Sequence, residues 1–206
     1  MRPEAEPVAA AIAARRSMRR FAARPVATTT VRELIALACT APAPHHSRPW
    51  RFVHIATAEA RETLADAMSD AWRADLEQEG RSVHQIADLL ERSQRQITDA
   101  PVLLLACLCL DEARAWPDAR RQAAERHMFV QSLGAALQNL LLAAGERGLV
   151  GYLKGAPLFC QDAVRAALDL PPDWAPAFLV LLGYPRAGPG TAARPPVAAE
   201  EFLVER

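Results

Sequence analysis

The stretch APAPHHSRPWRFV, residues 41–53, decides how the chain around it must fold. Its prolines Pro42, Pro44 and Pro49 lack backbone donors and push the residues before them out of helical geometry, so a preceding helix must end here. We expect an extended loop that carries polar side chains and enters a strand at Trp50. A binding loop has this shape and chemistry, and an ordinary surface connection between a helix and a strand is the alternative.

A cluster of arginines lies upstream, in the sequence RRSMRRF at residues 15–21. It follows an Ala-rich helix that we expect over residues 8–16. Because guanidinium groups match phosphate oxygens two at a time, four arginines beside the hydroxyl of Ser17 favour a phosphorylated ligand. A solvated basic helix end, stabilised by the helix dipole, is the other interpretation.

Composition restricts the possible functions. The 206 residues are 51% hydrophobic, which is enough for a sizeable core in one domain spanning residues 1–206. The net charge is zero, so neither nucleic acid nor an anionic membrane is an expected partner. The sequence contains no apolar run of the ~20 residues that a spanning helix needs and no signal peptide, so we expect a soluble, cytoplasmic protein. The four cysteines show no metal or disulfide spacing.

Periodicity and capping signals predict an alternation of helices and strands. Capping boxes at Thr30 with Glu33 and at Ser82 with Gln85 start two of the helices. The expected helices cover residues 30–38, 59–78, 82–98, 118–147 and 157–168, and the expected strands cover residues 51–56, 101–110, 149–155 and 176–183. The strand at 101–110 is apolar on both faces and should be central.

The segment 118–147 predicts a helix of about 45 Å at ~1.5 Å per residue, which is long for a domain of this size. From Met128 onward it is apolar nearly all round, so it must be covered on every side. That requirement is typical of a central helix in a homodimer interface.

Two of these stretches together resemble a known pattern. RRS-x-R-x-F followed by a Pro-rich polar loop, the dipeptide PW and a strand resembles the flavin-binding pattern of the nitroreductase family. Further stretches, including ITDAP, AERHMF, GAALQ and LDLPPDW, resemble in order the carboxy-terminal flavin domain of the actinobacterial coenzyme F420 gamma-glutamyl ligase. The resemblance spans residues 11–204. It implies an α+β nitroreductase-like fold, with a central mixed or antiparallel sheet between helices and the long helix at an obligate dimer interface.

The resemblance also implies a flavin mononucleotide (FMN) site shared between two subunits. Its phosphate and ribityl end would be held by Arg15, Ser17, Arg19 and Arg194, with Arg16 flanking the ring edge. The other subunit would contribute a second wall from Pro42, Ala43, Pro44, His46 and Arg48. Arg95 is a candidate for the pyrimidine edge of the ring, and the backbone near Lys154 and Gly155 would lie beside its reactive nitrogen. Residues 184–206 would form an arm on the partner subunit.

The run Tyr152-Leu153-Lys154-Gly155 departs from that branch, in which a Trp-Ile-Gly-Ser-like run is expected. Lys154, the one lysine of the sequence, either stabilises negative charge on the ring or lies in solvent. His45 and His46 have no third ligand at a sensible spacing, so no metal is expected.

Three functions remain open, all with a small-molecule ligand. The first is an FMN-dependent oxidoreductase that reduces the dehydro precursor of coenzyme F420, a deazaflavin. The second is a general NAD(P)H nitroreductase or quinone reductase. The third is a non-catalytic flavin or deazaflavin binding protein. Either enzyme would take electrons from NAD(P)H or a reduced deazaflavin, and no side-chain nucleophile is required, because the cofactor carries the chemistry.

Overall fold

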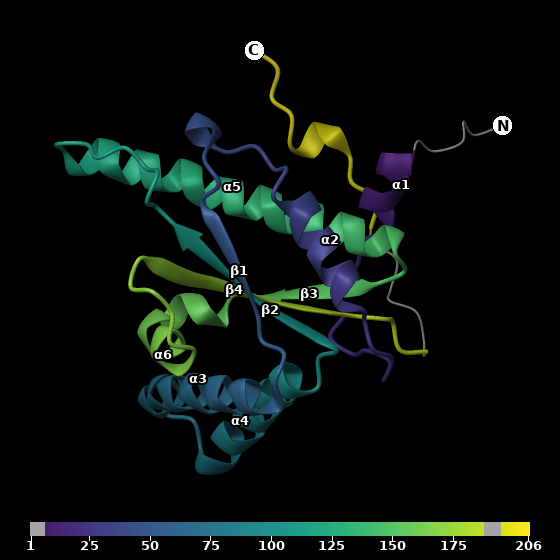
Figure 1. Ribbon diagram of the computed structural model, residues 1–206, viewed down its shortest axis with the longest axis vertical. Helices are drawn as coiled ribbons and strands as arrows, with labels where there is room; N and C mark the ends of the chain where they lie inside the picture. Colours follow the sequence, from purple (N-terminus) through teal and green to yellow (C-terminus); the bar gives the residue numbers. More distant parts are fainter. Residues whose placement is uncertain (1–6, 188–194) are drawn as a thin grey trace.

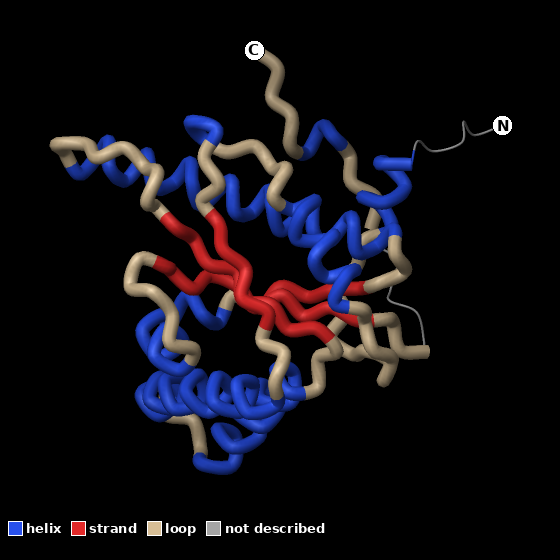
Figure 2. Tube along the Cα trace, in the orientation of Figure 1, coloured by secondary structure: helices blue, strands red, loops and turns tan. Residues whose placement is uncertain are grey.

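The computed structural model describes residues 7–187 and 195–206 (Figure 1). Within these residues one antiparallel sheet has the strand order β1-β2-β4-β3. Its strands are β1 (Trp50–His54), β2 (Val102–Cys109), β3 (Val150–Lys154) and β4 (Trp174–Gly183). Helices lie on both faces of the sheet (Figure 2). The expected α+β architecture, with a sheet between helices, is confirmed, and the sheet is antiparallel throughout.

Two layers of helices enclose this sheet. One face is covered by α1 (Pro7–Ala14), α2 (Thr28–Ala38) and α5 (Ala119–Glu146), and the other by α3 (Ala58–Gln78), α4 (Val83–Thr98) and α6 (Gln161–Ala167). Short 3-10 helices are η1 (Pro44–His46), η2 (Ala156–Phe159) and η3 (Ala199–Glu201). The segment expected as one helix over residues 157–168 is therefore divided between η2 and α6.

Strand β2 is the centre of both hydrophobic cores. Every one of its residues is buried. Leu104 and Leu108 point into the core beside α2 and α5, whereas Leu103 and Leu105 point into the core beside α3 and α6. Because side chains alternate along a strand, an apolar run such as VLLLACLC can line two cores at once. The expected central strand is confirmed.

The helix termini confirm one capping box and correct another. Ser82 Oγ accepts from the backbone N–H of Gln85, and the Gln85 side chain accepts from the Ser82 N–H. In contrast, α2 begins at Thr28, and its N-cap Ala27 has no side-chain bond. The box expected at Thr30 is therefore wrong, because the helix extends two residues further toward the amino terminus.

Helix α5 runs along the whole sheet, and the Asp118 side chain accepts from the N–H of Arg121 at its start. The expectation that it is covered on every side is not met within a single chain. Met128 is 42% exposed and Val130 40%. They belong to an exposed stripe with His127, Gln131, Gly134 and Gln138. By length and composition α5 is also apolar enough to cross a membrane, but half of the relevant window is buried inside the protein, as in a core helix.

Arg61, near the start of α3, connects the helical layer of α3, α4 and α6 to the sheet. Its guanidinium donates to the carbonyl oxygens of Ile55 (2.9 Å), Thr98 (3.2 Å) and Ala100 (2.6 Å). The Ile55 carbonyl directly follows β1, the Thr98 carbonyl ends α4, and the Ala100 carbonyl lies two residues after α4. One charged side chain therefore fixes the angle at which the α3–α4 pair meets the sheet.

Arg61→Met should lower the free energy of unfolding by about 2 kcal/mol, because three carbonyl oxygens lose a charged donor while the apolar stem is kept. Urea unfolding followed by circular dichroism measures this change. Arg73→Met, at an exposed position of the same helix, is the matched control and should leave stability within about 0.5 kcal/mol. Equal stability of the two variants would contradict the proposed role of Arg61.

Candidate functional site

The arginine segment lies along the free edge of β3. Helix α1 ends at Ala14, so Arg15 and the residues after it leave helical geometry earlier than expected. Ser17 then forms a parallel bridge with Gly151, and the Met18 N–H donates to the Gly151 oxygen at 3.0 Å. The arginine segment is thereby fixed to the sheet.

Gly151 permits this arrangement because there is no room for a side chain. A Cβ at that position would lie 2.6 Å from Leu141 Cδ2 and 2.7 Å from Leu182 Cδ2. Backbones approach closely only where glycine is present. The absence of a side chain at Gly151 therefore lets β3 pack closely against Leu141 of α5 and Leu182 of β4.

The side chains of this segment lie close to one another. Arg15 Nη1 is 3.4 Å from Ser17 Oγ, to which it donates. The Arg19 guanidinium lies over the ring of Tyr152, 4.2 Å from its centroid, in a cation–π contact. Arg16 turns back instead and donates to the Ala13 oxygen at 2.6 Å. Arg15, Ser17 and Arg19 thus form one basic group on β3, while Arg16 closes the end of α1.

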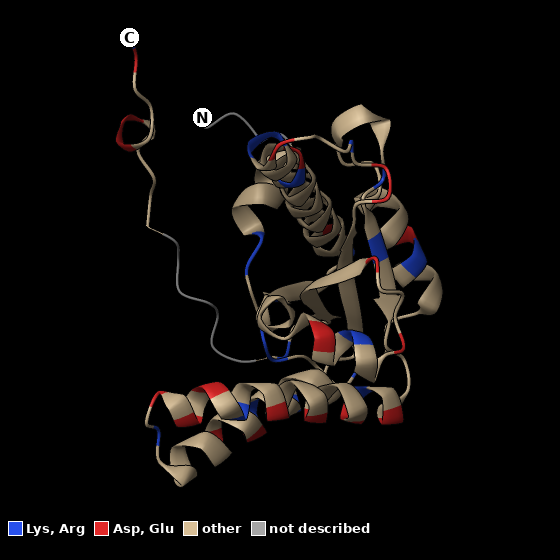
Figure 3. Cartoon of the chain, turned by 90° about the vertical axis from the view of Figure 1, so that its left-hand side faces the viewer, with Lys and Arg blue, Asp and Glu red and all other residues tan. Residues whose placement is uncertain are grey.

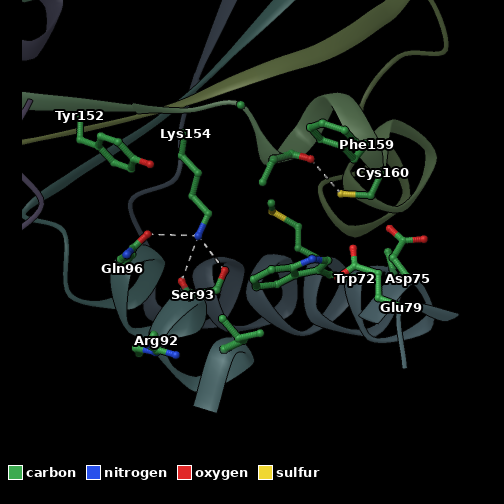
Figure 4. Close-up of a pocket in the computed structure, with 15 residues that line it drawn as sticks. Trp72, Asp75, Glu79, Arg92, Ser93, Gln96, Tyr152, Lys154, Phe159 and Cys160 are labelled. Atoms are coloured by element: carbon green, nitrogen blue, oxygen red, sulfur yellow. Dashed lines mark hydrogen bonds between the residues drawn. The ribbon is translucent and has the colours of Figure 1, made fainter. Parts of the chain in front are cut away.

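Lys154 extends from the end of β3 toward α4 (Figure 4). Its Nζ donates to Ser93 Oγ at 2.6 Å and to Gln96 Oε1 at 3.2 Å. Burial, with a further contribution from the nearby charge of Arg19, lowers the pKa of Lys154 from its ordinary value of 10.5 to about 8. In the described part of the chain no carboxylate lies within ion-pair distance of Lys154. The site therefore holds a half-buried cation that only neutral groups solvate.

Lys154 forms one wall of a cavity of about 670 Å³ between the α3–α4 pair and the end of β3 (Figure 4). Trp72 of α3 and Phe159 of η2 contribute aromatic surface, and Asp75 and Glu79 lie at its far end. The other lining residues are Met68, Ala71, Leu89, Arg92, Ser93, Gln96, Tyr152, Gly155, Ala156 and Cys160. A flat apolar slot beside a cation fits an aromatic ligand that carries or gains negative charge.

Of the expected site residues that the structure describes, only Lys154 and Gly155 line this cavity. Arg95 lies on an exposed side of α4 and forms an ion pair with Glu91. Ser93 and Gln96, which the sequence reasoning passed over, face Lys154 instead. Their spacing of three residues, in the last turns of a helix that leads into a buried strand, is the signal that identifies the inward face.

The Pro-rich loop is held in a specific shape at the opposite end of α5. His45 and His46 both adopt positive φ, 58° and 56°, which costs a residue with a side chain about 1–2 kcal/mol. Ser47 Oγ donates to the Pro44 oxygen at 2.6 Å, and the Cys109 N–H donates to the Pro49 oxygen at 3.0 Å. Strained, well-anchored backbone of this kind concentrates at functional sites.

Glu125 of α5, which the sequence analysis did not identify, anchors this loop. Its carboxylate is 2% exposed and accepts from His45 Nε2 (3.1 Å), Arg114 N (3.0 Å) and Trp116 Nε1 (3.1 Å). The bonds from Arg114 and Trp116, followed by that from His45, hold the pKa of Glu125 below its ordinary value. An ionised acceptor requires His45 to present its Nε2–H.

The two halves of the expected site are far apart within one chain. The Pro-rich loop packs near Phe129, since the His45 and Phe129 ring centroids are 6.4 Å apart, whereas the arginine segment lies near Leu141 in a second cavity of about 530 Å³. Twelve residues of helix separate these positions, or ~18 Å at ~1.5 Å per residue. Figure 1 shows α1 beside the carboxyl end of α5.

The structure therefore brings Arg19 close to Lys154, beside Tyr152, whereas Arg15 and Arg16 line the second cavity between α1, α5 and β3. Neither cavity is lined by a residue of the Pro-rich loop. Of the loop residues, Pro42, His46 and Arg48 are exposed, and Ala43 and Pro44 are partly buried. Arg194 lies outside the described residues.

Comparison with known proteins places this arrangement in a family. The family model described as "Nitroreductase family" matches residues 12–184. The chain is 33% identical over 174 residues to 5,6-dimethylbenzimidazole synthase of Rhodospirillum rubrum, covering 84% of this chain and 79% of that protein.

Solved structures share the fold. A BluB-like flavoprotein from Clostridium difficile has a TM-score of 0.73 at 22% identity, over 95% of this chain and 96% of that one. An NADPH:FMN oxidoreductase from Vibrio harveyi, solved with NAD⁺, has a TM-score of 0.70 at 22% identity, over 97% of this chain and 77% of that one. With a family model that covers most of its length and a basic group and a cavity on β3, the chain belongs to the nitroreductase family.

Proposed function

We propose that the protein is an FMN-dependent oxidoreductase that works as a cytoplasmic homodimer and takes electrons from NAD(P)H. The observation that carries this proposal is the position of Arg19 over Tyr152, close to Lys154 and its cavity, with Ser17 and Arg15 beside the same strand β3. A mononucleotide needs cations for its phosphate and a flat slot for its ring. The family and the named flavoprotein neighbours support the choice of FMN.

The residues present fit that cofactor. Arg15 and Arg19 would bind the phosphate and ribityl end, with Ser17 as a hydroxyl partner. Lys154, with no carboxylate beside it, would lie at the ring. When bound, FMN supplies electron transfer between donor and acceptor, and its ring gains negative charge as it accepts electrons. The protein's own contribution is to bind, to orient and to offset that charge.

A second copy of the chain would complete the site. The Pro-rich loop cannot reach its own arginine segment, because about 18 Å of α5 separates them. In a two-fold dimer in which the exposed stripes of α5 pack together, the loop of one protomer would approach the arginine segment of the other. We also propose that the segment after β4 forms an arm on the partner. Its described residues Phe202, Leu203 and Val204 are 61–77% exposed, and residues 195–206 lie apart from the body (Figure 3).

Three reactions are candidates for this oxidoreductase. Short sequence stretches favour reduction of the dehydro precursor of coenzyme F420. The identity to 5,6-dimethylbenzimidazole synthase favours formation of that compound. A nitro compound or quinone is the third candidate. Anaerobic titration with NADH, NADPH or reduced deazaflavin, followed by each acceptor and product analysis, separates the three. Bound flavin that none of the donors reduces would favour a binding protein and contradict the proposed enzyme.

Arg15→Ala and Arg19→Ala should each weaken FMN binding about tenfold to a hundredfold, because each removes a charged donor from the phosphate. Riboflavin, which has no phosphate, should bind as it does to the wild type. Flavin fluorescence titration measures both dissociation constants. Arg20→Ala, an exposed neighbour, is the matched control. Equal losses for FMN and riboflavin would contradict the phosphate assignment.

Lys154 should make the flavin midpoint potential depend on pH in two regimes. Below pH about 8 the amine is already protonated. Above that pH the Lys154 amine is neutral while the flavin is oxidised. Reduction of the ring would add negative charge beside the amine, and the amine would then take up a proton. The potential should therefore fall more steeply with pH above about 8 than below. Spectroelectrochemical titration between pH 6 and 9.5 tests this expectation.

Lys154→Met should give a single slope and a lower potential, since the neutral side chain offers no charge to the ring. Lys154→Arg should also give one slope but keep a higher potential, because arginine stays charged throughout this range. A break at pH 8 that persists in both variants would assign the titration to another group.

Gly134→Arg should yield a folded monomer that has lost FMN. The residue lies in the exposed stripe of α5, and a Cβ added there would have no neighbouring atom within 4 Å. Sedimentation velocity and flavin absorbance measure the two losses together. Arg15→Ala provides the contrast, because it should lose FMN while remaining a dimer. A Gly134→Arg monomer that keeps FMN would contradict the shared site.

A further inference from the structure

The buried carboxylate of Glu125, a residue of α5, anchors the Pro-rich loop and makes none of the flavin contacts proposed above. The Glu125 carboxylate is 2% exposed and joins three segments: α5 itself, the Pro-rich loop through His45, and the loop after β2 through Arg114 and Trp116. An ionised carboxylate is costly to bury, so its three donors are needed to keep it there. In return, the carboxylate fixes the position of every group that binds it.

The anchor decides which side of the loop faces outward. The His45 side chain, 32% exposed, turns toward Glu125, and Ser47, 4% exposed, folds back onto Pro44. Between and after them, His46 and Arg48 are exposed. Because His45 and His46 share a left-handed turn, a loop released from Glu125 would relax toward ordinary backbone angles and redirect both outward side chains.

We propose that Glu125 is a positioning residue for the flavin ring bound by the other subunit. Through His45 it holds the left-handed turn that presents His46 and Arg48 to the ring. This assignment rests on the proposed function, and in particular on the shared flavin site. It makes Glu125 a determinant of the ring wall and leaves the phosphate end, on Arg15 and Ser17 of the opposite chain, independent of it.

The Glu125→Gln variant tests the assignment. A carboxamide has one acceptor oxygen, so its NH₂ group must face either the indole N–H of Trp116 or the donors of His45 and Arg114. Either the indole donor of Trp116 or the two donors of His45 and Arg114 then lack an acceptor. Dissociation constants for FMN and riboflavin should both rise about tenfold, and by the same factor, because the phosphate end is unchanged. Flavin fluorescence titration and sedimentation velocity measure affinity and oligomeric state.

Two further variants separate positioning from general stability. His45→Asn keeps a residue that tolerates the left-handed turn but is too short to bind Glu125, and it should weaken both flavins as Glu125→Gln does. Adding Trp116→Phe to Glu125→Gln removes the unmatched indole donor, so the amide oxygen can again accept from His45 and Arg114. That double variant should recover most of the lost affinity. Glu112→Gln, an exposed glutamate of the loop after β2, is the matched control and should bind both flavins normally.

Each outcome decides the assignment. Equal weakening of FMN and riboflavin in an intact dimer, with recovery in the double variant, supports it. Unchanged affinities in Glu125→Gln and His45→Asn overturn it, as does a loss confined to FMN or a loss explained by dissociation of the dimer. A wild-type protein that binds neither flavin overturns the proposed function and this assignment together, and is recognised before any variant is made.

Discussion

The rigidity and length of α5 are the constraint on which the proposed site depends. The helix packs its buried face on the sheet and holds the Pro-rich loop near Glu125 and the arginine segment near Leu141. A helix cannot shorten without breaking backbone hydrogen bonds, so no motion of one chain brings these segments together. The same helix leaves an exposed stripe along its outer side. The length of α5 separates the two half-sites, and its outer side forms the open face. The proposed two-fold partner would complete the site and cover that face.

Electrostatics give the β3 half of the site its chemical character. Arg19 stacks on Tyr152 and raises the cost of charging Lys154, while Ser93 and Gln96 supply neutral acceptors. A carboxylate beside Lys154 would stabilise its positive charge, as three donors stabilise the negative charge of Glu125, but none lies within ion-pair distance in the described residues. The uncompensated cation instead leaves room for a negative charge that arrives with a ligand or develops on it. Lys154 thus gives this cavity a group whose pKa, and hence whose change of charge, lies at about 8.

Rigidity of the cavity comes from groups outside its walls. Arg61 binds three carbonyls and sets the α3–α4 pair against the sheet. Gly151 allows β3 to pack closely against α5, and the arginine segment bridges to β3 at the same residue. On the far end of α5, Glu125 does the same for the Pro-rich loop. Each of these residues acts by holding backbone in place, which is how a binding site stays ready for its ligand.

The sequence by itself determined the element order, the buried central strand, the Ser82 capping box and the presence of an arginine segment and a Pro-rich loop, because periodicity, prolines and local capping act within a few residues. It did not determine that α2 starts at Thr28, two residues before the expected box, with Ala27 as an N-cap that offers no side-chain bond. Nor did it identify Ser93, Gln96 or Glu125, because the Lys154 partner of the first two and the His45 partner of Glu125 lie 58 to 80 residues away. Tertiary structure alone decided that Lys154 meets α4 and that Arg95 turns outward, because the side of a helix that faces a distant strand depends on how the two elements pack.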